Sequence, residues 1–251
     1  MNSAKTYSGN EILSGRTQDI NVAYIAGKLN DRGIVLGEVR MIPDDENRII
    51  ETINELRSCF DYIFTTGGIG PTHDDITASC VAKAFGVALE RNPAAYTLLE
   101  NHYGPGEVTD ARARMAMIPA GAALIPNPVS AAPGFIIGNV HVMAGVPRIM
   151  QAMFENVLET LEGGPPFLSN TITCEMPESE LAGDMAALQN EFPDVLIGSY
   201  PHFRTGHFGL SVVLKGTDAA RIKAASEALV ERIRARGKTP GALSLQVPID
   251  F

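Results

Sequence analysis

The chain alternates strand and helix patterns from residue 19 to residue 86, and this alternation constrains its fold more than any other feature. Residues 19–32 carry apolar side chains at helical spacing before Gly33, and residues 34–40 then have the composition of a strand. The series continues with a helix behind Asp44–Asp45, a strand at 61–66 and a helix at 77–85. Strands joined by helices at this rhythm pair in parallel. We therefore predict an α/β fold with three layers, in which helices flank a mostly parallel sheet.

The middle of the chain is richer in turns. Helical patterns at 91–103 and 109–117 precede a proline-rich loop at 126–135, and residues 134–145 then predict a hairpin around Gly138–Asn139. Pro147 is expected to open the next helix, where its missing N–H does no harm.

The run EGGPPF at 162–167 interrupts the pattern strongly, and we place a domain boundary there. The first domain is expected at 1–165. Residues 166–251 predict a second, small α+β domain, because two of its strands adjoin and helices flank them.

The composition excludes several kinds of partner. The chain of 251 residues has a formal net charge of -9, so we expect no nucleic acid partner. No apolar run has the length needed to span a bilayer, and residues 1–10 lack the pattern of a secretory signal. The three cysteines have no paired spacing, which is typical of reduced thiols. We therefore expect a cytoplasmic protein that does not associate with membranes.

The segment TTGGIGPTHDDIT at 65–77 combines glycines with neighbouring acids at the end of a predicted strand. The residues concerned are Gly67, Gly68, Gly70, Asp74 and Asp75. Glycines let backbone N–H groups approach a ligand, and the start of the following helix favours negative charge. The carboxylates would repel a phosphate unless a cation lies between them, and Mg²⁺ binds through one or two carboxylates together with phosphate oxygens. These residues predict a metal-assisted site for a phosphate or pyrophosphate group.

A purely structural interpretation of the same segment stays open at this point. Asp75 or Thr77 could cap the helix, and the paired glycines could close a tight turn. The segment matches neither the P-loop nor the dinucleotide-binding pattern, so neither of those mechanisms is supported.

Five ordered segments resemble one known family. TTGGIGPTHDDIT resembles the signature loop of the molybdopterin-binding (MogA/MoaB/gephyrin-type) superfamily, which acts in molybdenum cofactor (MoCF) biosynthesis. The resemblance is closest to the N-terminal domain of the competence/damage-inducible protein CinA. The other segments are GNEILSGRTQDIN (9–21), IPDDENRI (42–49), IPNPVSAAPGF (125–135) and MAGVPRIM (143–150). Together they cover roughly residues 8 to 160.

This resemblance implies a set of site residues. The loop glycines Gly67, Gly68 and Gly70 would cradle the phosphate of a pterin or a nucleotide. The implied metal ligands are Asp44, Asp74, Asp75 and Glu11, and the first three are also the candidate catalytic residues. Further ligand contacts are implied for Thr77, Ser14, Ser130, Gly134, Gly145 and Pro147. The implied cofactor is Mg²⁺ or another divalent cation, with molybdopterin as a ligand.

The sequence departs from the family pattern at three places. Asp74 stands where the cofactor-synthesis enzymes commonly have an arginine, which favours metal dependence over capture of a bare phosphate. AKTYS (4–8) is polar where the family usually has an apolar first strand, so we expect either a poorly formed strand or an unusual chain start. Full-length CinA-like proteins carry a nicotinamide mononucleotide amidohydrolase domain, and the residues after 165 are too few and differently patterned to match it.

Three functions follow from the resemblance. The first is a module that binds a pterin or nucleotide (pyro)phosphate with a divalent metal. The alternative is a metal-dependent pyrophosphatase on ADP-ribose-like or dinucleotide substrates, and molybdopterin adenylyltransferase is a weaker third because of Asp74. The family also implies a homo-oligomer. Outside the named set, Arg112 and Arg114 are expected to face solvent, with contact to a ligand phosphate as the alternative.

Overall fold

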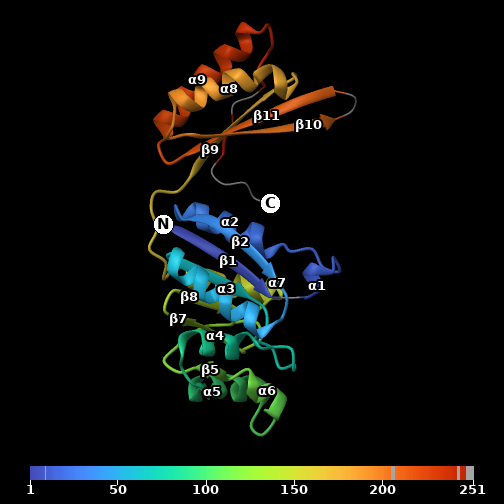
Figure 1. Cartoon of the computed structure of the whole chain (residues 1–251), viewed down its shortest axis with the longest axis vertical. Coiled ribbons are helices and arrows are strands. Elements are labelled where there is room, and N and C mark those ends of the chain that lie inside the picture. Colours follow the sequence, from blue (N-terminus) through green and yellow to red (C-terminus); the bar gives the residue numbers. More distant parts are fainter. Residues whose placement is uncertain (9, 205–206, 242–243, 247–251) are drawn as a thin grey trace. The chain divides into compact units, whose positions relative to one another are not determined.

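The computed structural model describes residues 1–8, 10–204, 207–241 and 244–246. Within these, side chains are described for all but residues 7, 8, 10, 11, 203, 204, 207, 208 and 244–246. The chain forms two compact units (Figure 1). One comprises Met1–Leu29 and Ile34–Gly164, and the other comprises Asn30–Gly33 and Pro165–Phe251.

A mostly parallel sheet forms the centre of the first unit, in the order β2-β1-β3-β8-β7-β6 (Figure 1). Strands β1, β2, β3 and β8 are parallel to one another, and β7 runs antiparallel to both β6 and β8. The strands are β1 (Asn2–Ser8), β2 (Val35–Ile42), β3 (Tyr62–Thr66), β6 (Ala123–Ile125), β7 (Gly134–Ile137) and β8 (Val140–Met143). The predicted sheet is confirmed.

Helices cover both faces of this sheet and complete the three predicted layers. Neighbouring residues of a strand point to opposite faces, and in β3 Ile63 joins one buried cluster while Phe64 joins the other. Helices α3 and α4 pack in the first cluster, and α2 and α7 pack in the second. The helices are α1 (Asn10–Leu13), α2 (Asn21–Asp31), α3 (Glu46–Cys59), α4 (Thr77–Phe85), α5 (Pro93–Tyr103), α6 (Asp110–Arg114) and α7 (Pro147–Leu158). No helix of the described residues is both long enough and apolar enough to cross a membrane.

The helix predicted at 109–117 is shorter than expected. Helix α6 ends at Arg114, and Met117–Pro119 form strand β5, which pairs antiparallel with β4 (Leu89–Arg91). Residues before a proline favour extended backbone, and Ile118 is buried in the core when it takes that conformation. Burial therefore overrides the helical spacing at this position.

The polar first strand is fully formed and lies between β2 and β3. Two of its buried polar side chains, Ser3 and Lys5, have partners from elsewhere in the unit. Ser3 Oγ donates a hydrogen bond to the Val35 carbonyl oxygen at 3.0 Å, and Lys5 Nζ lies 3.2 Å from Asp19 Oδ2. The other oxygen of Asp19 accepts a hydrogen bond of 2.7 Å from Val22 N in the first turn of α2. The strand tolerates polar residues because Asp19 is buried with Lys5, so the expectation of a poorly formed strand is wrong.

The second unit has a four-stranded antiparallel sheet, in the order β10-β11-β9-β12. Two helices pack on it around a buried cluster that includes Leu229 and the paired residues Ile172 and Val212 of neighbouring strands. The elements are β9 (Leu168–Cys174), α8 (Glu178–Glu191), β10 (Leu196–Arg204), β11 (His207–Gly216), α9 (Ala219–Ala235) and β12 (Ser244–Gln246). The predicted small α+β domain is confirmed.

The buried pair of Lys5 and Asp19 generates a stability prediction. Replacing Asp19 by Asn is expected to lower the free energy of unfolding by about 3 kcal/mol or more, because it removes a carboxylate beside a buried ammonium. The double variant K5M/D19N is expected to recover much of that loss, because Met fills a similar volume without charge. Urea unfolding of the three proteins measures this. A loss below about 0.5 kcal/mol in D19N, the range of ordinary surface substitutions, would contradict it.

The same pair predicts how stability depends on pH. Burial lowers the pKa of Lys5, while Asp19 opposes this shift, so the shift should grow in D19N. A lysine with a folded-state pKa below its unfolded value binds more protons when unfolded, and stability then rises with pH in that window. The stability of D19N relative to wild type should therefore improve as the pH rises toward the unfolded-state pKa of lysine, about 10.4. A constant difference over this range would contradict the assignment.

Candidate functional site

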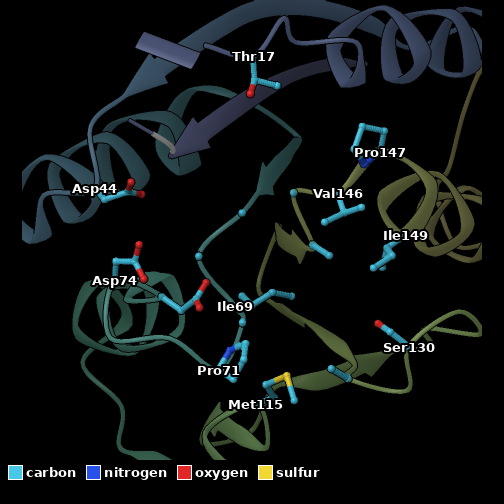
Figure 2. A pocket seen from close by; sticks show the side chains of 17 residues that line it. Thr17, Asp44, Ile69, Pro71, Asp74, Met115, Ser130, Val146, Pro147 and Ile149 are labelled. Carbon is cyan, nitrogen blue, oxygen red and sulfur yellow. The ribbon is translucent and has the colours of Figure 1, made fainter. Parts of the chain in front are cut away.

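A cavity of about 550 Å³ lies where the four parallel strands end. Its walls come from segments that follow the carboxyl ends of β1, β2, β3 and β8, together with the loop before β7. Ligands of open α/β sheets bind at this edge. The lining residues are Thr17, Asp44, Gly67, Gly68, Ile69, Gly70, Pro71, Asp74, Asp75, Met115, Ser130, Ala132, Ala144, Gly145, Val146, Pro147 and Ile149 (Figure 2).

The glycine loop owes its shape to positive backbone angles and a close approach to α4. Gly67 and Gly68 have φ of 98° and 69°, values that other residues rarely adopt. The carbonyl oxygen of Gly68 accepts a hydrogen bond of 3.0 Å from Thr77 N. A Cβ on Gly68 would lie 2.1 Å from Thr77 Oγ1, so no larger residue fits there unless Thr77 moves. The start of α4 is therefore packed directly against the loop.

Asp74 and Asp75 are held by Thr72. Asp75 Oδ2 accepts a hydrogen bond of 2.8 Å from Thr72 N, and the Thr72 hydroxyl lies within hydrogen-bonding distance of both carboxylates. The hydrogen bond from Thr72 is the main cause that lowers the pKa of Asp74 below its usual range. Helix α4 begins after Ile76 without a side-chain cap, so the interpretation of Asp75 or Thr77 as its cap is wrong. Both carboxylates are thus restrained at the cavity.

Asp44 reaches the same cavity from a different element. It lies in the turn between β2 and α3, and Figure 2 shows its carboxylate on the same side of the cavity as that of Asp74. Its neighbour Asp45 has another task, because Asp45 Oδ1 accepts a hydrogen bond of 2.9 Å from Arg48 N and caps α3. Of these two adjacent aspartates, Asp44 therefore lines the cavity and Asp45 caps the helix.

The described residues contain no group of three or more His, Cys, Asp or Glu side chains close enough to hold a metal ion by themselves. Glu11, the fourth implied metal ligand, lies in α1, and its side chain is outside the described part of the structure. Mg²⁺ is commonly held by one or two carboxylates with substrate phosphates and water. The three aspartates that line the cavity fit that mode better than a metal site built from protein ligands alone.

The opposite wall is the beginning of α7. Helix α7 starts at Pro147 as predicted, and its first residue follows Val146, which provides no side-chain cap. The N-terminal turn of a helix carries partial positive charge, so this wall favours an anion. The Gly145 carbonyl oxygen accepts a hydrogen bond of 2.8 Å from Asn21 Nδ2, which ties this wall to the start of α2.

Ser130 lies in a loop that Asn127 organises. The side-chain oxygen of buried Asn127 accepts hydrogen bonds from Val129 N and Ser130 N, both at 3.1 Å. Its Nδ2 donates to Ser130 Oγ at 2.8 Å and to the Ala132 carbonyl oxygen at 2.7 Å. Ala131 has a φ of 62°, an uncommon conformation for alanine. Asn127 therefore fixes the loop that carries Ser130, a role that sequence reasoning missed.

The structure brings most of the implied site residues together. Those that line the cavity are Asp44, Gly67, Gly68, Gly70, Asp74, Asp75, Ser130, Gly145 and Pro147. Thr77 is buried behind the loop, Ser14 is not part of the lining, and Gly134 lies in β7. A Cβ on Gly134 would lie 2.2 Å from the Val142 carbonyl oxygen, so this glycine serves the packing of the strands. Sequence reasoning gave no role in the site to Thr17, Met115, Val146 or Ile149.

Comparison with known proteins identifies the family. Residues 6–163 match the family model described as probable molybdopterin binding domain, and residues 166–239 match the middle domain of FAD synthase. The chain belongs to the molybdopterin-binding domain family. A protein from Pyrobaculum arsenaticum is 34% identical over 252 residues, which cover 93% of this chain and 94% of that protein.

The predicted resemblance to the CinA branch is also confirmed. A CinA-like protein from Geobacter sp. (strain M21) is 37% identical over 156 residues, which cover 60% of this chain and 38% of that protein. The crystal structure of the protein CinA with unknown function from Thermoplasma acidophilum covers 63% of this chain and 96% of that chain, with 32% identity and a TM-score of 0.60. This chain is therefore similar to CinA proteins over roughly the length of its first domain.

The contact between Gly68 and Thr77 predicts unequal effects of two alanine substitutions at the two ends of α4. Gly86, the C-cap of α4, has a φ of 67° and nothing within 4 Å of a Cβ, so G86A should cost only about 1 kcal/mol. G68A has the same backbone strain and also displaces Thr77, and it should cost at least about 1 kcal/mol more. Urea unfolding of both variants measures the difference. Equal losses would show that the close approach has no energetic importance.

Proposed function

We propose that the cavity binds the phosphate or pyrophosphate group of a pterin or nucleotide together with a divalent cation, with Mg²⁺ as the expected ion. The observation that carries the proposal is the position of Asp44, Asp74 and Asp75 beside a glycine loop on one cavity. Among the described residues that line this cavity, none is Lys or Arg. A phosphate beside these carboxylates therefore needs a cation to offset the repulsion.

Different residues of the chain would bind the cation and the phosphate. One or two of Asp44, Asp74 and Asp75 would hold the cation together with phosphate oxygens and water, and the open backbone of the glycine loop would approach the phosphate oxygens. The first turn of α7 would add a favourable field from the opposite wall. When bound, Mg²⁺ would neutralise phosphate charge and orient the group.

Hydrolysis of a pyrophosphate bond is the second candidate function. It is favoured by the three carboxylates, which could orient a water molecule as well as a cation. With ADP-ribose, water would attack one phosphorus and the bridging P–O bond would break, which gives AMP and ribose 5-phosphate. Molybdopterin adenylylation has less support, because Asp74 stands where the cofactor-synthesis enzymes commonly have an arginine, whose positive charge would assist that reaction.

Two adjacent aspartates provide a matched test of metal-dependent binding. D44N should weaken the binding of ADP-ribose in the presence of Mg²⁺ by about tenfold or more, equivalent to roughly 1.4 kcal/mol, because it removes a charge from the cavity wall. D45N should leave binding unchanged, because Asp45 caps α3 and Asn is an equally good cap. Titration calorimetry with and without Mg²⁺ measures both. Equal binding by wild type and D44N would remove Asp44 from the site.

A product assay separates binding from hydrolysis. Wild-type protein is incubated with ADP-ribose and Mg²⁺, and AMP is quantified by chromatography. Formation of AMP that D75A abolishes would establish the pyrophosphatase, with circular dichroism as the check that D75A remains folded. Mg²⁺-dependent binding without AMP would leave the binding module.

A further inference from the structure

A second, smaller cavity of about 230 Å³ adjoins the first across the glycine loop. The two share the loop residues Gly68, Ile69, Gly70 and Asp75, together with Met115. Much of the remaining wall of the smaller cavity is apolar, with Leu89, Met117 and Phe135 among its residues. A ligand that spans both cavities would therefore meet Asp44 and Asp74 on one side of the loop and a largely apolar wall on the other.

The two cavities differ in charge. Asp75 lines both cavities, whereas Asp44 and Asp74 line only the larger one and Arg114 lines only the smaller one. Arg114 is the one Lys or Arg among the residues that line either cavity in the described part of the chain. It directly precedes Met115, which borders both cavities, so Arg114 belongs to the region where the cavities meet.

The two arginines of α6 have different surroundings. Arg112 Nη1 donates a hydrogen bond of 2.6 Å to the Glu107 carbonyl oxygen, and its guanidinium lies 4.0 Å from the centre of the Tyr103 ring. Arg112 is therefore occupied in holding the turn before α6. Arg114 is exposed and forms no salt bridge within the described residues.

We propose that Arg114 recognises the phosphate group of the ligand from the smaller cavity, while the cation on the aspartates binds the same group from the larger one. This rests on the proposed function. Arginine presents a planar fork of donors that matches phosphate oxygens. The cofactor-synthesis enzymes commonly have an arginine at the position of Asp74, next to Asp75. In this chain, Arg114 would provide a cationic side chain from the other side of the loop. The ligand class is a phosphate or diphosphate attached to a ring system that fits the apolar lobe.

The test compares R114Q with R112Q in the full chain, with ADP-ribose and adenosine as probes at saturating Mg²⁺. R114Q should weaken ADP-ribose binding by about tenfold or more, because a charge-assisted hydrogen bond is lost. Its affinity for adenosine should stay unchanged, because that probe has no phosphate. R114K should recover part of the loss, because Lys keeps the charge without the fork. R112Q should bind ADP-ribose as wild type does.

Each outcome decides between the two proposals. If wild type fails to bind ADP-ribose, the proposed function fails and the role of Arg114 fails with it. If wild type binds and R114Q binds equally well, the role of Arg114 alone is overturned. If R112Q and R114Q weaken ADP-ribose binding equally, or if R114Q weakens adenosine binding as much as ADP-ribose binding, the effect comes from a change in the structure of α6. Either result would also overturn the role of Arg114.

Discussion

The close approach of Gly68 to Thr77 is the constraint on which the cavity depends. It places the first turn of α4 directly behind the loop, so the chain turns sharply after β3 and returns Asp74 and Asp75 to the carboxyl edge of the sheet. Thr72 then restrains both carboxylates. Because these residues come from one short segment, their geometry follows from local packing and local hydrogen bonds.

The charge of the cavity explains why one protein would combine acids with an anion site. The start of α7 and the open glycine backbone favour negative charge, whereas Asp44, Asp74 and Asp75 oppose it. The divalent cation that we propose would remove this conflict, because the acids would attract it and it would attract phosphate. The hydrogen bond from Thr72 lowers the pKa of Asp74, which extends the charged state of this carboxylate toward lower pH.

Much of the first domain could be predicted because its helices and strands have clear periods. The start of α7 at Pro147 and the end of α4 at Gly86 are as predicted. The gathering of Asp44 with the loop follows from parallel strands, whose carboxyl ends share one edge. The formation of strand β1 could not be predicted from its own polar sequence, because the partner of buried Lys5 is Asp19, which lies outside the strand. Thr77 and Gly134 resembled ligand residues, yet small residues serve close packing equally well, and only the fold distinguishes these roles.

In the proposed site, a cation links the acids beside the glycine loop to a bound phosphate. The most direct measurement is a crystal structure of the protein with Mn²⁺ and ADP-ribose, in which anomalous scattering locates the metal. We expect an anomalous peak within coordination distance of Asp44, Asp74 or Asp75, with a phosphate oxygen of ADP-ribose on the same ion. Phosphate bound without a metal there, or a metal bound away from these carboxylates, would contradict it.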